Sequence, residues 1–284
     1  MEFQRRSVQC ADPSGLHRLS YLEWSGPDPS RVLVCVHGLT RCGRDFDFLA
    51  RALRDRYRVV CPDLPGRGES DWLKKPADYP GPTYIADMVT LIARLDVESV
   101  DWVGTSLGGM IGMALAALPG TPVRKLVLND VGPLLTAQSL NRIGEYVGKA
   151  PSFPSLEEAE QFIRTIAASF GPHSDAQWRF LTEHVVRRQA AGGGWEMRYD
   201  PGIAEIYNAR EHDKDLDIWA VYDAVKAPTL VLRGSESDLL TPQTAKAMTE
   251  RGPRARVVEL PGVGHAPTLI DERQIALVRD FLAP

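Results

Sequence analysis

Ser106 stands at the centre of a Gly-x-Ser-x-Gly pattern, Gly104-Thr-Ser-Leu-Gly108. A serine hydroxyl is a weak nucleophile near neutral pH and needs a base within hydrogen-bond reach, itself oriented by a third group. The pattern follows a short apolar stretch, Val100–Val103, and precedes a helical stretch that starts at Leu107. In such a strand-turn-helix setting the tight turn lifts the hydroxyl off the edge of a sheet. Ser106 is therefore the predicted nucleophile.

His265 is the predicted base. It lies in Gly262-Val-Gly-His-Ala-Pro267, a Gly-rich loop after the last predicted strand, Arg256–Leu260. A short loop at that place can return an imidazole over Ser106. Only neutral imidazole accepts a proton, so we expect activity to rise with pH as His265 loses its proton. The alternative interpretation is an ordinary histidine of a surface loop.

Asp238 is the predicted third group, in the loop after the strand Thr229–Arg233. A carboxylate there can hold His265 in the tautomer that accepts the serine proton. Asp130 is the alternative, because it follows another predicted strand, Val123–Leu128. Whichever of the two aspartates does not take this role is expected to be a solvated loop charge.

An oxyanion that forms at a substrate carbonyl needs preorganised N–H donors, each worth roughly 3–4 kcal/mol. The backbone amides of Leu39 and Leu107 are the predicted donors. Leu39 lies in His37-Gly-Leu-Thr40, directly after the strand Arg31–His37, and Leu107 follows the nucleophile. His37 is expected to shape this loop rather than to transfer a proton.

The elements that position these residues alternate between strand and helix. Such alternation predicts an α/β fold, a mostly parallel sheet with helices on both faces, whose site lies at the carboxyl ends of the strands. Loose alternation predicts a strand over Leu16–Trp24, and short apolar runs predict the strands Arg31–His37, Tyr57–Cys61, Val100–Val103, Val123–Leu128, Thr229–Arg233 and Arg256–Leu260. Apolar spacing of three and four predicts helices around Phe46–Leu53, Tyr84–Leu95, Leu107–Leu118, Pro242–Glu250 and Ile270–Leu282.

The stretch 131–216 interrupts this alternation. It shows no comparable apolar strand, only helical segments, two of them opened by Ser155 and Ser174 at capping-box spacing. We therefore expect a core of residues 1–130 and 217–284 with an inserted helical lid over the strand ends. The aromatic residues of the lid are expected to bury its apolar face more often than to contact substrate, and Gly192-Gly-Gly194 is either a hinge or a flexible loop.

Composition excludes several classes of function. The 284 residues carry 33 Lys and Arg against 37 Asp and Glu, so no basic field is available for nucleic acid. No run is long and apolar enough to cross a bilayer, and no export signal is visible, which makes a cytoplasmic protein the default expectation. The four cysteines match no zinc or redox spacing and predict reduced structural thiols. No metal and no cofactor is expected, and the sequence indicates no oligomeric state.

With these motifs in order, the sequence resembles the α/β-hydrolase fold family, in its lid-bearing esterase and lactonase-like branch. The resemblance covers nearly the whole chain outside the lid, including Asp63-Leu-Pro-Gly-Arg-Gly-Glu-Ser70, a turn-forming and loop-anchoring element. It implies that Ser106, Asp238 and His265 form a triad and that Leu39 and Leu107 form the oxyanion hole. Some members of the fold supply the acid from the place of Asp130.

The resemblance implies a cofactor-independent serine hydrolase that cleaves a small carboxylic ester or lactone through an acyl-enzyme. Carbon–carbon hydrolases of ring-cleavage diketones share the triad and are an alternative; Ala266 and Pro267 after the histidine weigh against them, while Arg187 or Arg188 leaves the question open. A non-catalytic ligand receptor on the same scaffold is the alternative from another class.

Overall fold

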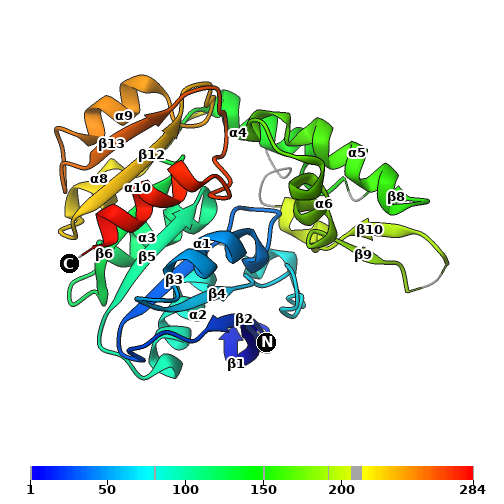
Figure 1. Cartoon of the computed structure of the whole chain (residues 1–284), viewed down its shortest axis with the longest axis horizontal. Coiled ribbons are helices and arrows are strands. Elements are labelled where there is room, and N and C mark those ends of the chain that lie inside the picture. The colour runs from blue at the N-terminus through cyan, green and yellow to red at the C-terminus, as the bar shows by residue number, and fades with distance from the viewer. Residues whose placement is uncertain (1, 80, 150, 191, 206–212, 284) are drawn as a thin grey trace.

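A central eight-stranded sheet organises the chain, as the computed structural model shows (Figure 1). The structure describes residues 2–79, 81–149, 151–190, 192–205 and 213–283. Within them the strand order is β1-β2-β4-β3-β5-β6-β12-β13, antiparallel from β1 to β4 and parallel from β4 onward. The strands are β1 (Gln4–Asp12), β2 (Gly15–Trp24), β3 (Val32–Val36), β4 (Arg58–Pro62), β5 (Val100–Thr105), β6 (Val123–Asn129), β12 (Thr229–Gly234) and β13 (Arg256–Leu260).

Helices cover both faces of this sheet, because its central strands are apolar on both sides. All of β3 is buried, and its alternate residues point into different clusters: Val34 into one, Leu33 and Cys35 into the other. The first cluster also contains side chains of α2 (Gly81–Leu95), α3 (Leu107–Ala116), α8 (Trp219–Ala224) and α9 (Pro242–Met248). The second contains side chains of α1 (Asp47–Leu53) and α10 (Glu272–Leu282). This confirms the predicted α/β class.

Between β6 and α8 the chain leaves the sheet, and we call residues 131–216 the insertion. Figure 1 shows α5, α6 and β8–β10 of this segment to one side of the sheet. Its described helices and strands are β7 (Leu134–Leu135), α4 (Ala137–Tyr146), β8 (Ser152–Phe153), α5 (Leu156–Ile166), α6 (Asp175–Glu183), β9 (Val186–Arg188), β10 (Trp195–Met197) and β11 (Leu216–Asp217). Short 3-10 turns are η1 (Gly43–Phe46), η2 (Pro76–Asp78), η3 (Ala168–Phe170) and η4 (Pro201–Ala204).

The helix starts predicted from capping signals are confirmed. Ser155 and Ser174 are the N-cap residues of α5 and α6, and their hydroxyls accept the N–H of Glu158 and Gln177. At Ser174 the Gln177 side chain also accepts the cap N–H, which completes a capping box. Gly192-Gly-Gly194 lies near the β9–β10 connection, and residue 191 beside it lies outside the described residues.

The prediction that the insertion lacks strands is wrong. Three short strands form a small antiparallel sheet in the order β8-β10-β9, and β11 pairs with β7. Two to three residues are too few to show a period of two, so the sequence carried no usable signal. Strand β1 was also missed, because this edge strand is mostly exposed and polar, and its backbone pairing with β2 supplies its order.

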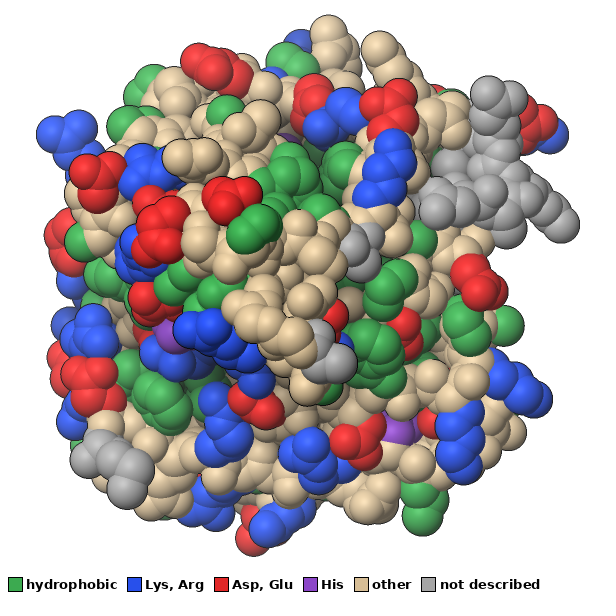
Figure 2. Space-filling view, turned by 90° about the vertical axis from the view of Figure 1, so that its right-hand side faces the viewer, with side chains coloured by type: hydrophobic (Ala, Val, Ile, Leu, Met, Phe, Trp, Pro, Cys, Tyr) green, Lys and Arg blue, Asp and Glu red, His purple; other side chains and the backbone are tan. Residues whose placement is uncertain are grey.

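No helix among the described residues combines the length and the apolar character that crossing a bilayer requires. Figure 2 shows the side of the molecule that carries the insertion, where acidic and basic side chains alternate around smaller apolar areas. The face shown therefore has no broad field of a single charge sign.

Candidate active site

Ser106 occupies the tight turn between β5 and α3. Its backbone lies at φ 52° and ψ −116°, a region that non-glycine residues rarely adopt. The flanking glycines are needed because the backbone approaches so closely. A Cβ on Gly104 would lie 2.2 Å from the Gly108 oxygen, and one on Gly108 would lie 2.0 Å from the Val36 oxygen. The Gly-x-Ser-x-Gly pattern is thus explained by steric fit.

His265 lies in the loop between β13 and α10, with its ring directed at Ser106. Its Nε2 atom is 3.0 Å from Ser106 Oγ, and its Nδ1 atom is 2.7 Å from Asp130 Oδ2. The imidazole therefore links the hydroxyl to a carboxylate, with Nδ1–H as the donor to Asp130 in the tautomer that leaves Nε2 to accept from Ser106. Both contacts have ordinary hydrogen-bond lengths.

Asp130, directly after β6, is held by the neighbouring strand-end loop. Its Oδ1 accepts the N–H of Gly234 at 2.8 Å, and its Oδ2 accepts the hydroxyl of Ser237 at 2.6 Å. The carboxylate side chain is fully buried. With His265 as the third donor, the buried charge is stabilised by hydrogen bonds from three directions, which also fix its orientation.

The prediction that Asp238 orients His265 is corrected by this geometry. Asp238 side-chain atoms are 54% exposed, and Oδ1 pairs with Arg142 Nη2 at 2.9 Å on the insertion. Within the loop after β12, Ser237 points inward to Asp130 and Asp238 points outward. Asp130 had been the alternative, and the order Ser, acid, His holds for either aspartate, so chain order did not discriminate between them.

The two predicted oxyanion donors lie beside Ser106. Leu39 and Leu107 both line the cavity that contains Ser106 and His265. Leu107 is the first residue of α3, where a backbone N–H has no acceptor within the helix. A Cβ on Gly38 would lie 3.6 Å from Ser106 Cβ, so the loop after β3 lies against Ser106.

Buried side chains anchor that loop. His37 is buried; its Nε2 accepts the Leu64 N–H at 2.9 Å, and its Nδ1–H donates to the Gly38 oxygen at 2.6 Å. Burial lowers the pKa of His37 to about 3, so the ring stays neutral. It is thus engaged in shaping the loop, as expected.

Arg67 is a second anchor, which the sequence did not reveal. Its side chain is fully buried, and Nε donates to the Leu39 oxygen at 2.7 Å. Nη1 donates to the Pro65 oxygen and to Tyr84 Oη. A buried guanidinium on a Gly-rich turn cannot be recognised from composition, since arginine is usually exposed. Here it fixes the peptide group that follows the proposed oxyanion donor of Leu39.

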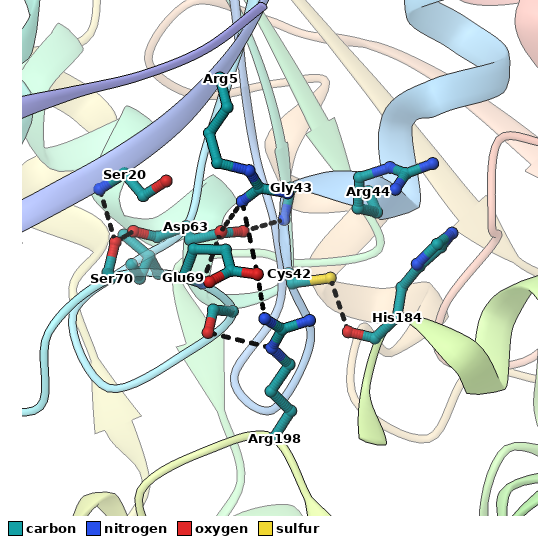
Figure 3. A network of polar contacts seen from close by, with 12 residues as sticks. Arg5, Ser20, Cys42, Gly43, Arg44, Asp63, Glu69, Ser70, His184 and Arg198 are labelled. Atoms are coloured by element: carbon teal, nitrogen blue, oxygen red, sulfur yellow. Dashed lines mark hydrogen bonds and ion pairs between the residues drawn. The ribbon is translucent and has the colours of Figure 1, made fainter. Parts of the chain in front are cut away.

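A polar network joins the same loop to the insertion (Figure 3). Asp63 accepts the N–H of Gly43 at 2.7 Å and that of Glu69 at 2.9 Å. From the insertion, Arg198 pairs with Glu69, and the carbonyl of His184 accepts from Cys42 Sγ at 3.3 Å. Asp63 thus anchors the turn, as its motif predicted, and the network holds the insertion against the core.

The cavity over Ser106 has a volume of about 410 Å³, within the usual size range for small-molecule sites. Mostly apolar side chains line it, from α2 and α3 of the core and from α4 and α5 of the insertion. Of the insertion's aromatic residues, Tyr146 and Phe170 line the cavity, while Phe153 packs against Phe162. Arg187 and Arg188 are not among the lining residues; Arg187 pairs with Glu196.

Residues 33–280 match the model of the alpha/beta hydrolase family. The chain belongs to this family. The alpha/beta hydrolase sheet order and the Ser106 turn described above agree with that membership.

Two solved structures and one curated relative are similar over nearly their whole length. The 3-hydroxybutyrate-oligomer hydrolase of Cupriavidus necator is 49% identical over 280 residues, which is 96% of each chain. An alpha/beta hydrolase from Novosphingobium aromaticivorans is 36% identical with a TM-score of 0.89, covering 99% of this chain and 98% of that one. A Rickettsia typhi protein is 33% identical with a TM-score of 0.91 over 98% of both chains.

Among the residues that the structure describes, one group of potential metal ligands lies elsewhere in this alpha/beta hydrolase. The ligand atoms of Cys10, His17 and Asp87 lie within 4.8 Å of one another, all buried. His17 already bonds through both ring nitrogens, to Asp12 at 3.0 Å and to Asp87 at 2.9 Å. These contacts tie the β1–β2 hairpin to α2. The four cysteines are free thiols and all are buried, as predicted.

Proposed function

We propose that the protein hydrolyses a small carboxylic ester through an acyl-enzyme on Ser106, with His265 as general base and acid and Asp130 as the orienting acid. The single observation that carries the proposal is the continuous chain of contacts from Asp130 through His265 to Ser106, at 2.7 and 3.0 Å. The ester-hydrolysing relative in Cupriavidus necator supports the class of substrate.

The reaction would proceed in two halves. Ser106 Oγ attacks the ester carbonyl while His265 Nε2 takes its proton, and the N–H groups of Leu39 and Leu107 stabilise the oxyanion. Collapse of this intermediate breaks the acyl–oxygen bond, and His265 gives its proton to the leaving alkoxide. A water activated by His265 then cleaves the acyl-enzyme and releases the acid.

Asp130 would act through His265 rather than on the substrate. Its buried carboxylate holds Nδ1–H and stabilises the imidazolium that forms in each half-reaction. The fixed bonds from Gly234 and Ser237 mean that this stabilisation requires little reorganisation.

The insertion would act as a lid. Its α4 and α5 line the same cavity as Ser106 and His265, so they would shape the space for the acyl and alcohol groups. By similarity to the Cupriavidus necator relative, we infer a short oligoester of a hydroxy acid such as 3-hydroxybutyrate as substrate. The same mechanism would also open a lactone of similar size.

Steady-state hydrolysis of p-nitrophenyl esters from acetate to octanoate tests the proposal. We expect saturable turnover with a preference for short acyl chains, and labelling of Ser106 by a fluorophosphonate, located by peptide mass spectrometry. Turnover of a vinylogous ring-cleavage diketone well above that of every ester would favour a carbon–carbon hydrolase instead. Labelling without turnover of any of these substrates would favour a receptor.

A further inference from the structure

The charges that line the cavity are all of one sign. Among its described lining residues, the side chains that carry a permanent charge are Arg41 and Arg142, and none is an aspartate or a glutamate. The other polar side chains that line it include Ser106 and His265. A cavity with cationic and without acidic lining groups favours a ligand that carries a negative charge.

Arg41 is already neutralised. Its Nε and Nη2 atoms bond both carboxylate oxygens of Asp45, at 2.8 and 2.6 Å, and Nη2 also donates to the Leu181 oxygen. The side chain is 13% exposed, and its guanidinium lies 5.8 Å from the ring of Phe170. Arg41 therefore ties the loop after β3 to the insertion and leaves little capacity for a ligand.

Arg142 is held much more loosely. It projects from α4 with 43% of its side chain exposed, and its described hydrogen bond runs from Nη2 to Asp238 Oδ1. Asp238 is itself more than half exposed, and an ion pair of this kind contributes little to stability. A guanidinium has five N–H donors, so Arg142 can bind a second carboxylate beside Asp238 or in its place.

A linear oligoester of a hydroxy acid carries one free carboxylate, at the end of its alcohol portion. The ester bond to be cleaved must lie over Ser106, and the carboxylate must then lie in water or against a cation. Most of the other side chains that line the cavity shared by Ser106 and Arg142 are apolar, such as Leu140 and Ile143. A carboxylate bound at Arg142 would therefore fix which ester bond reaches the nucleophile.

We propose that Arg142 binds the terminal carboxylate of the oligoester and so selects free acids over their neutral analogues. This proposal rests on the proposed function and adds the substrate's charged end to it. Arg142 is in this view a specificity residue. Asp238 provides a carboxylate of the protein itself, which the substrate carboxylate joins or replaces at the Arg142 guanidinium.

The test compares two substrates that differ only in that charge. One is the linear dimer of 3-hydroxybutyric acid, and the other is the same dimer with its terminal carboxylate replaced by a primary carboxamide. We expect the wild type to prefer the acid in kcat/KM, mainly through KM. Arg142→Gln should lower the ratio of acid to amide about tenfold, the low end of the range for a hydrogen bond to a charged group. Arg142→Lys should restore part of it.

Two further variants sharpen the measurement. Asp238→Asn removes a like charge next to the bound carboxylate and should raise the acid-to-amide ratio by about two- to fivefold. Arg279→Gln is the matched control, since Arg279 forms a similarly exposed pair with Glu272 on α10 and does not line the cavity. It should keep the wild-type ratio.

The outcomes separate the two proposals. If the wild type hydrolyses neither p-nitrophenyl butyrate nor either dimer, the proposed function is wrong and the role of Arg142 is lost with it. If p-nitrophenyl butyrate is hydrolysed but Arg142→Gln and wild type show the same acid-to-amide ratio, the role of Arg142 is wrong and ester hydrolysis stands. Turnover of p-nitrophenyl butyrate by the variant itself shows that it is folded.

Discussion

The core and the insertion contribute to the cavity in opposite ways. The core supplies Ser106, His265 and Asp130 from the ends of β5, β13 and β6, and the Asp130 carboxylate is fully buried and bonded on both oxygens. The insertion supplies mostly apolar side chains and Arg142, whose ion pair is about half exposed. Rigid strand ends can thus hold the reacting groups, while the less constrained segment sets which molecule reaches them.

The largest expected effect comes from the core. Ser106→Ala removes the proposed nucleophile, so kcat on p-nitrophenyl butyrate should fall by at least about 10⁴-fold. Burst kinetics and fluorophosphonate labelling should disappear together with turnover. Activity within tenfold of wild type would mean that the acyl-enzyme forms elsewhere or not at all.

A second effect of the core concerns stability at low pH. Burial lowers the pKa of His37 to about 3 in the folded state, whereas an unfolded chain binds that proton near pH 6.5. Above pH 6.5 the His37 imidazole is neutral in both states. Below pH 6.5 it gains a proton in the unfolded state but not in the folded state. Stability should therefore fall between pH 6.5 and pH 3, by up to about 2 kcal/mol at pH 5 from this group.

Urea unfolding at pH 7.0 and pH 5.0 measures this loss. His184, whose pKa burial also lowers to about 3, contributes with the same sign. Burial lowers the pKa of His173 as well, so His37→Gln removes one of three such histidines. The variant should be less stable at pH 7.0 but should lose less stability on acidification. An equal loss in variant and wild type would contradict the assignment to His37.

The insertion should change selectivity more than rate. Ile143→Ala enlarges the cavity on the side of α4, so the ratio of octanoate to butyrate turnover should rise, by about tenfold if the extra methylenes pack there. Val89→Ala is the matched control, because Val89 is exposed on α2 and does not line the cavity. A fall of kcat for all chain lengths alike would place Ile143 with the reacting groups instead.

The smallest expected effect is on the stability of helix α6 in the insertion. Ser174→Ala removes the capping box at the start of α6 and should lower the free energy of unfolding by about 1 kcal/mol. Thr90→Ala, inside α2, should not lower it, since alanine favours helix interiors. Equal effects of the two changes, measured by urea unfolding, would show that the cap adds nothing.

The sequence predicted the elements of the core better than those of the insertion, because buried strands and tight turns restrict which residues they contain. Strands buried on both faces need continuous apolar residues, so a strand such as β3 (Val32–Val36) could be predicted from its apolar run. Seven of the sheet's eight strands were predicted. Edge strand β1 and the short strands of the insertion depend on backbone pairing, which leaves no such run. Ser106 and His265 stood out because a tight turn and a Gly-rich loop have strict local requirements.

The third group could not be chosen from local pattern. Asp130 and Asp238 both follow parallel strands, and adjacent residues of the loop after β12 point in opposite directions, with Ser237 inward and Asp238 outward. That direction depends on how β6 and β12 pack together. Which aspartate contacts His265 therefore depends on tertiary packing. The hydrogen bond from Arg67 to the Leu39 oxygen also depends on tertiary packing, so local pattern did not predict it.

The most direct test of the central claim compares Asp130→Asn with Asp238→Asn, using kcat/KM on p-nitrophenyl butyrate. Asp130→Asn leaves His265 in the wrong tautomer and should lose about 10³- to 10⁴-fold. Asp238→Asn breaks a half-exposed ion pair and should lose less than about threefold on this neutral ester. A loss of 10³-fold in Asp238→Asn, with Asp130→Asn close to wild type, would contradict the account.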